Sequence, residues 1–176
     1  MMKHIILKIL PLLVFTLLKS QEMIINKQIS FGVHHSTFEI LSDSLYYVVS
    51  NVANKNYTEK KGIIAIINDE GEVKNLIKLG SNNNYILSST KLQDNNFLFV
   101  GYNKENNDEW NKIYVIKTDQ NFNMMWENSY GPLNSDSKGY SIIETNENEY
   151  WILGHTKTSK NGVLLLKIDK EGTEKW

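Results

Sequence analysis

Residues 115–131 read VIKTDQNFNMMWENSYG, and residues 140–156 read YSIIETNENEYWILGHT. Both stretches place runs of β-branched and aromatic residues between turns rich in Asp, Asn and Gly, a pattern typical of short strands. The turn in the first stretch recurs as NDEGEVKN from Asn68, DQNFNMMW from Asp119 and DKEGTEKW from Asp169. Its spacings of 51 and 50 residues indicate a structural repeat.

A second set of features follows the same period. The runs LSDSLYYVVS, LQDNNFLFVG and TNENEYWILG end 51 and 53 residues apart, at Ser50, Gly101 and Gly154. Glycines also end the first two copies of the turn region, at Gly80 and Gly131. Because two independent sets of positions agree on the period, chance similarity does not account for it.

Each period contains four strand-like runs, which in the second copy are residues 86–92, 97–103, 112–118 and 124–130. The connections are short, so neighbouring runs are expected to pair antiparallel. No stretch after residue 21 shows a sustained helical periodicity with capping residues. The sequence therefore predicts an all-β fold: a partial β-propeller of about three four-stranded antiparallel blades, after an N-terminal signal peptide.

The quoted stretches also resemble the repeat of secreted bacterial β-propeller proteins. In that repeat an apolar strand leads to Lys-x-Asp, an Asn/Gly turn, a Trp, a Tyr-Gly pair and a strand that ends in Gly. The resemblance covers roughly residues 28–176. It is strongest in the second copy and weakest in the first, where Asn68 and Asn75 replace the Asp and the Trp. It implies the fold and says little about function.

The repeated turns are expected to be hairpin connections. Asp119 and Asp169 can accept hydrogen bonds from the backbone of their own turns, and Gly172 tolerates a positive φ. A calcium loop is the alternative, because Asp119, Asn121 and Asn123 alternate as ligands do. The rest of that template is missing, since no glycine stands at the sixth place and no glutamate at the twelfth.

The tryptophans and strand-end glycines also have expected roles. Trp126 and Trp176 occupy one phase of the repeat, where a large ring can fill the gap between neighbouring sheets; stacking on a sugar is the alternative. Trp110 follows the acidic stretch KENNDE and is the better candidate for ligand stacking. A glycine at the end of a second strand, as at Gly101 and Gly154, allows a bend or a close approach of another segment.

The residues indicate no catalytic, cofactor or metal site. His34 and His35 are adjacent, so in a strand their side chains point to opposite faces and do not readily chelate one metal. No Gly-x-Ser-x-Gly nucleophile motif occurs, and the carboxylates are scattered on predicted loops. We therefore expect no catalytic residue, no cofactor and no metal from the sequence.

The pattern of the amino-terminal residues predicts a secretory signal peptide. Met1-Met2-Lys3-His4 carries positive charge, ILPLLVFTLL follows at residues 9–18, and Ser20 is a small residue at which cleavage is expected. The predicted division is residues 1–20 as signal peptide and residues 21–176 as incomplete blades of a larger ring. A retained membrane anchor is the alternative, but ten residues at about 1.5 Å each cover only half of a ~30 Å hydrocarbon core.

Composition excludes several classes of function. The chain has no cysteine, which excludes disulfides, thiol nucleophiles and cysteine zinc sites. Its 19 basic residues are all lysines, so arginine-based reading of DNA bases is excluded. Without residues 1–20 it would carry 16 lysines and 20 acidic residues, a formal charge of 16 − 20 = −4. Such a chain has no electrostatic attraction to nucleic acid or to anionic lipid.

The strand count is expected to leave the ring open. Residues 24–31 are expected to form a single strand before Gly32, equivalent to the fourth strands that precede Gly80 and Gly131. The third copy reaches Trp176 at the place where its own fourth strand should begin. Three blades are fewer than the usual four to eight, so exposed blade faces are expected to self-associate. Two hypotheses follow: the chain is part of a longer propeller, or two chains each give three blades to a six-bladed ring.

The functional expectation is an exported, non-enzymatic β-propeller module for binding or scaffolding. By resemblance, its ligand is expected to be a carbohydrate or a protein at the cell surface, outside the cell or in the periplasm. The alternative is a truncated propeller enzyme, a hydrolase or a quinone-dependent oxidoreductase, whose active site needs the missing blades. A remnant with no independent function is the third hypothesis. A fold alone does not decide among these.

Overall fold

The computed structural model describes residues 34–53, 59–80, 83–104 and 109–176, and in these ranges it contains strands and turns but no helix. The predicted signal peptide and the lone strand at residues 24–31 lie outside the described residues. No described segment is a helix capable of crossing a membrane.

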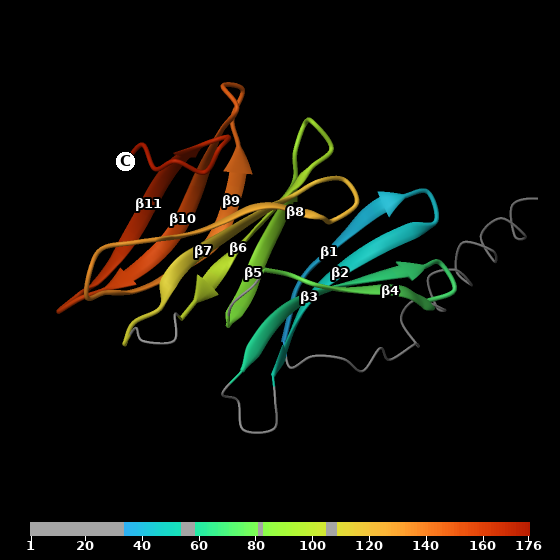
Figure 1. Ribbon diagram of the computed structural model, residues 1–176, viewed down its shortest axis with the longest axis horizontal. Helices are drawn as coiled ribbons and strands as arrows, with labels where there is room; N and C mark the ends of the chain where they lie inside the picture. The colour runs from blue at the N-terminus through green and yellow to red at the C-terminus, as the bar shows by residue number, and fades with distance from the viewer. Residues whose placement is uncertain (1–33, 54–58, 81–82, 105–108) are drawn as a thin grey trace, which may run out of the picture.

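Eleven strands in the described residues form three separate antiparallel sheets (Figure 1). The first sheet contains β1 (His34–Ser42), β2 (Leu45–Ala53), β3 (Lys60–Asn68) and β4 (Val73–Lys78). The second contains β5 (Asn84–Lys91), β6 (Phe97–Asn103), β7 (Lys112–Thr118) and β8 (Met124–Tyr130). The third contains β9 (Asp136–Glu144), β10 (Glu149–Lys157) and β11 (Asn161–Asp169).

Each sheet is a meander in which strands adjacent in sequence are adjacent in space. Three of the four predicted strands of the second copy have the predicted bounds, and β5 begins two residues earlier than predicted, at Asn84, and ends one residue earlier, at Lys91. The predicted all-β fold of propeller-like blades is therefore confirmed. The third sheet has three full strands and then an isolated bridge, Ile168 to Glu174, at the place where the sequence leads us to expect a fourth strand to begin.

The three repeated hairpin tips have the same geometry. The backbone N–H of Gly71, Phe122 and Gly172 donates to the carbonyl three residues earlier, at 2.9, 3.0 and 3.0 Å. All three residues have positive φ, at 73°, 64° and 81°. Phe122 is the one that is not glycine, and its ring stacks on Phe97 with centroids 4.7 Å apart. This core contact compensates for a backbone conformation that L-residues rarely adopt.

The first residue of each tip organises the turn with its side chain. The side-chain oxygens of Asn68, Asp119 and Asp169 each accept a hydrogen bond from the backbone N–H four residues later, at 2.7, 2.8 and 2.8 Å. A short acceptor side chain is needed for this bond, which explains why only Asn and Asp stand at this phase of the repeat.

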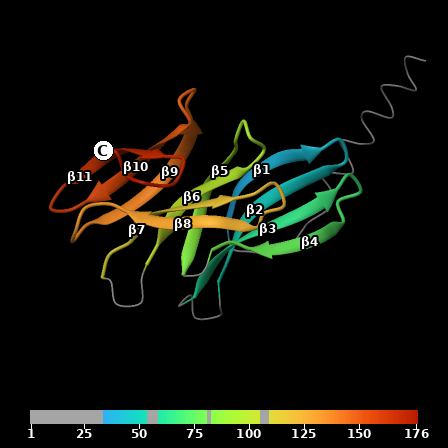
Figure 2. The ribbon, with the colours of Figure 1, turned by 45° about the horizontal axis from the view of Figure 1, so that its top comes forward.

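The sheets stack in chain order, with the second sheet between the first and the third (Figures 1 and 2). The first strand of each later sheet makes most of the contact: β5 packs on β1, β2 and β3, and β9 packs on β5, β6 and β7. The second sheet is consequently buried on both faces. Along β6, Phe97 and Phe99 belong to the core shared with the first sheet, whereas Leu98 and Val100 belong to the core shared with the third.

A β-bulge interrupts the pairing of the first two strands at the same place in all three sheets. It lies opposite Ser50 in the first sheet, Gly101 in the second and Gly154 in the third. A Cβ atom at Gly101 would stand 1.8 Å from the carbonyl oxygen of Tyr85, so the bulge of β5 requires glycine there. The backbone of Ile86, which pairs with Gly101 beside the bulge, is bound by the buried side chain of Asn51 through two hydrogen bonds of 2.7 Å.

Gly101→Ala is expected to lower the free energy of unfolding by roughly 1–3 kcal/mol or more, because the bulge must rearrange to admit a methyl group. Gly162→Ala is the matched control, since its Cβ would come no closer than 3.7 Å to another atom. Urea denaturation measures both. Equal stability of the two variants would show that the close approach at Gly101 is not required.

Tyr130 connects the second sheet to the tip of the third. Its hydroxyl donates to the carbonyl oxygen of Gly172 at 2.6 Å, and its side chain is buried in the core between these sheets. Burial, the main cause, raises the pKa of Tyr130 to about 12. The neutral phenol is therefore favoured in the folded state relative to the unfolded chain, whose tyrosines have a pKa near 10.

The contribution of Tyr130 to stability is expected to be constant below pH 10 and to fall between pH 10 and about pH 12, because only the unfolded chain ionises readily there. Tyr130→Phe removes one such group and should make this decline shallower. Tyr140→Phe, at a half-exposed position, is the matched control and should keep the wild-type slope. Thermal midpoints measured against pH test this, and a Tyr130→Phe slope equal to that of the wild type would contradict it.

Candidate functional site

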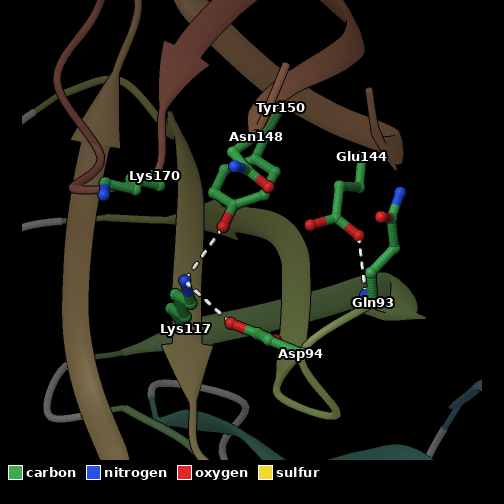
Figure 3. A pocket seen from close by; sticks show the side chains of 7 residues that line it. All are labelled: Gln93, Asp94, Lys117, Glu144, Asn148, Tyr150 and Lys170. Carbon is green, nitrogen blue, oxygen red and sulfur yellow. Dashed lines mark hydrogen bonds and ion pairs between the residues drawn. The ribbon is translucent and has the colours of Figure 1, made fainter. Parts of the chain in front are cut away.

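A pocket with a volume of about 420 Å³ opens between the second and third sheets, at the end of the stack that carries the hairpin tips. Charged and amide side chains and one tyrosine form most of its wall (Figure 3). The lining residues are Gln93, Asp94, Lys117, Glu144, Asn148, Tyr150 and Lys170.

The pocket is built from turns that recur in the repeat. Asp94 lies in the β5–β6 turn and Asn148 in the β9–β10 turn. These two turns have equivalent positive-φ asparagines, Asn95 at 65° and Asn148 at 56°, each with its N–H bonded to the carbonyl three residues earlier. Asparagine tolerates this conformation better than most residues do. The two turns therefore place side chains from both sheets around one opening.

Lys117 and Tyr150 form the floor of the pocket. The Lys117 ammonium donates to the Tyr150 hydroxyl at 2.9 Å and lies 5.4 Å from the centre of its ring. It also lies 3.9 Å from a carboxylate oxygen of Asp94. Lys117 is only 6% exposed, so this ammonium is almost removed from water and needs these partners.

Glu144 stands on the third-sheet side of the opening. One of its carboxylate oxygens accepts a hydrogen bond of 2.8 Å from the backbone N–H of Gln93, which joins the two sheets across the pocket (Figure 3). With Lys117 and Lys170 against Asp94 and Glu144, the charges of the lining side chains balance. The pocket thus offers both donors and acceptors without a strong net charge.

The ionisation of Tyr150 reflects this setting. Burial raises the pKa of the Tyr150 hydroxyl, and the hydrogen bond and positive charge of Lys117 act in the opposite direction. Near neutral pH the hydroxyl therefore keeps its proton and accepts from Lys117. It can act as a polar contact for a ligand but is not prepared to act as a base.

The polarity of this pocket is not a requirement of sheet stacking. In the junction between the first and second sheets, the equivalent positions are Ile66, 51 residues before Lys117, and Phe97, 53 residues before Tyr150. Both belong to the apolar core there: Phe97 is fully buried in it, and Ile66 is partly buried and packs against its edge. The same architecture thus closes without a lysine or a tyrosine at these positions. The polar pair is an addition specific to the second junction.

The residues predicted from the sequence lie elsewhere. Asp119 and Asp169 organise the tips, and the oxygens of Asp119 are occupied by Asn121 N–H and by the backbone and side chain of Asn123, at 2.8 Å each. No cluster of three or more metal-ligating side chains occurs in the ranges that the structure describes. Gly80 and Gly131 follow the fourth strands with φ of 69° and 130°.

The three tryptophans with predicted roles differ in their surroundings. The indole of Trp126 covers the third-sheet tip, where its N–H donates to the Lys170 carbonyl at 3.2 Å and its ring stands beside Gly172. The packing of Trp176 against a neighbouring sheet stays a prediction. Its ring is 54% exposed and meets Trp151 edge-on. Trp110 lies before β7, at the far end of that strand from the pocket, and does not line it.

Sequence reasoning missed Lys117 and Tyr150 as site residues. Lys117 is part of a repeated Lys-x-Asp pattern, and Tyr150 is one of many aromatic residues in predicted strands. The signal that could have identified them is a difference between copies of the repeat. Lys117 stands where the first copy has Ile66, and Tyr150 stands where the second copy has Phe97.

The fold and the pocket define the class: an all-β chain of repeated, propeller-like blades with a polar pocket at one blade junction. Comparison with protein-family models and with curated protein sequences gives no match, so the class rests on the structure.

A single and a double variant together test whether the polar pair is dispensable for folding. Tyr150→Phe alone should cost about 1–3 kcal/mol, because it leaves the buried Lys117 ammonium with one partner fewer. The double variant Lys117→Ile/Tyr150→Phe reproduces the pair at the first junction and should be at least as stable as the wild type. Urea unfolding measures both. A double variant less stable than the wild type would mean that the fold needs the pair.

Proposed function

We propose that the chain is an exported, non-enzymatic β-propeller module that binds carbohydrate through the pocket at Lys117 and Tyr150. One observation carries this proposal: polar side chains occupy positions that the other junction fills with an apolar pair. A buried ammonium costs free energy that an isoleucine would not, so a use other than packing is the physical reason to keep it.

The chemistry of the pocket supports a neutral, hydroxyl-rich ligand. Ammonium and amide groups donate hydrogen bonds, and the carboxylates of Asp94 and Glu144 accept them. Sugar hydroxyls do both. The balanced charge disfavours a strongly anionic or cationic ligand, and about 420 Å³ is within the range of small-molecule sites.

Export supports the same proposal. The predicted signal peptide would place the blades outside the cell or in the periplasm, where polysaccharides are abundant ligands. The resemblance to secreted bacterial repeat proteins points in the same direction. A protein ligand remains the alternative occupant, and a surface glycan is favoured because the pocket is small and concave.

Binding is tested by titrating the purified exported chain with a panel of neutral mono- and oligosaccharides in isothermal calorimetry. We expect at least one to bind, and Lys117→Ile to weaken that binding at least about tenfold. Lys157→Ile, at an exposed end of β10 away from the pocket, is the matched control and should bind as the wild type does.

Two results would contradict the proposal. One is the absence of binding to the whole panel, and the other is an equal loss of affinity in the two lysine variants. Chromatography of the ligand after incubation distinguishes the enzymatic alternative. If shorter saccharides were released, the carboxylates of Asp94 and Glu144 would have to act as a hydrolytic pair, and the module would be an enzyme.

A further inference from the structure

The floor of the pocket contains hydrogen-bond donors that the protein itself does not use. A lysine ammonium has three N–H groups, and that of Lys117 makes one hydrogen bond, of 2.9 Å, to the Tyr150 hydroxyl. The nearest carboxylate oxygen of Asp94 is 3.9 Å away, which is beyond hydrogen-bond distance. Among the residues that the structure describes, the other two N–H groups of Lys117 therefore have no acceptor.

Tyr150 adds a further unused donor. Its oxygen accepts the hydrogen bond from Lys117, so its own O–H is left to donate, and the described ranges contain no acceptor for it. Tyr150 is 1% exposed and Lys117 6% exposed. Buried donors without acceptors cost free energy. Both side chains line the pocket, so an occupant of the pocket is what can supply the missing acceptor (Figure 3).

The size of the pocket indicates an occupant larger than a water molecule. One water takes up about 30 Å³ of liquid, whereas the pocket has a volume of about 420 Å³. A water on the floor would leave most of this volume to be filled. A ligand that brings one oxygen atom to the floor and places other polar groups beside Gln93, Glu144 and Asn148 uses the whole cavity.

The floor matches the hydrogen-bonding capacity of a hydroxyl group. A hydroxyl accepts two hydrogen bonds and donates one. It can accept from Lys117 and Tyr150 and donate to Asp94, because an oxygen atom can lie ~2.8 Å from both of two groups that are 3.9 Å apart. The same Asp94 oxygen accepts from the Asn96 side chain at 2.8 Å, and a carboxylate oxygen has two lone pairs, so one remains.

Other oxygen groups fit this floor less well. An ether or carbonyl oxygen has no proton to donate, so it would meet the Asp94 carboxylate with lone pairs only. A carboxylate or phosphate would in addition bring a negative charge close to that of Asp94, which is unfavourable. Figure 3 shows the Lys117 ammonium between the Tyr150 hydroxyl and the Asp94 carboxylate, so all three groups can reach one atom of a ligand.

We propose that the floor binds a single ligand hydroxyl, which accepts from Lys117 and Tyr150 and donates to Asp94. This inference rests on the proposed carbohydrate binding and narrows the ligand class to neutral sugars with a free hydroxyl at the position that enters the floor. Tyr150 and Asp94 are then the residues that determine specificity. A sugar that lacks this hydroxyl is rejected, because its binding leaves the buried donors without an acceptor.

Isothermal calorimetry with modified sugars tests the proposal on the unchanged protein. The probes are the neutral saccharide of the panel that binds most tightly and its monodeoxy and monodeoxyfluoro derivatives, with one hydroxyl replaced at a time. At one ring position, we expect both replacements to weaken binding at least about tenfold. Fluorine cannot donate a hydrogen bond, so its effect shows that donation to a carboxylate is required.

Two variants identify the protein groups that recognise this hydroxyl. Tyr150→Phe removes one donor, and Asp94→Asn removes the charge that makes Asp94 a strong acceptor. In each variant the affinity ratio of the parent sugar to its deoxy derivative should fall at least about threefold. Tyr140→Phe, at a half-exposed position outside the pocket, is the matched control and should keep the wild-type ratio. Circular dichroism verifies folding, and the Asp94 side chain is 52% exposed, so Asp94→Asn is compatible with the fold.

The failure of this inference differs from the failure of the proposed function. If a saccharide binds but no single hydroxyl replacement weakens its binding tenfold, the inference is overturned and the proposed function stands. The same holds if the hydroxyl matters equally in the wild type, Tyr150→Phe and Asp94→Asn. If no saccharide of the panel binds, the proposed function is contradicted, and this inference with it.

Discussion

The structure depends on one constraint: each small sheet has two apolar faces, and exposing either of them to water is unfavourable. The second sheet satisfies this constraint completely, because Phe97 and Phe99 pack on one neighbour and Leu98 and Val100 on the other. A three- or four-stranded meander buries too little surface to be stable alone, so the sheets stabilise one another. The repeat period, the tip geometry and the conserved register of the bulges all serve to present these faces in the same orientation in each copy.

Most of this architecture could be predicted from the sequence, because its signals are local. Acceptor side chains at Asn68, Asp119 and Asp169 and the period-two pattern of the strands act over a few residues, and they recur. The bulges could not be predicted in detail: Gly101 indicated a close approach, but its partner Tyr85 is known only from the pairing.

The pocket shows why the candidate site was harder to predict than the fold. Lys117 follows the pattern of the repeat, and nothing local distinguishes it from an ordinary surface lysine in a strand. Its significance comes from Tyr150, 33 residues later, and from the apolar pair at the equivalent positions of the other junction. Sites of this kind are placed on a repeating scaffold by a few substitutions at a junction, whereas the scaffold itself is maintained by positions that stay the same in all copies.

Hydrogen–deuterium exchange of the folded chain, resolved by residue, tests the central claim most directly. If the sheets are stable only as a stack, the slowest exchange will be found in Phe97–Asn103 and Lys112–Thr118, the strands covered on both sides. Val73–Lys78, whose side chains are mostly exposed, will exchange much faster. Protection that is equal in the three sheets, or greatest in an outer one, would contradict the account, because each sheet would then be stable without its neighbours.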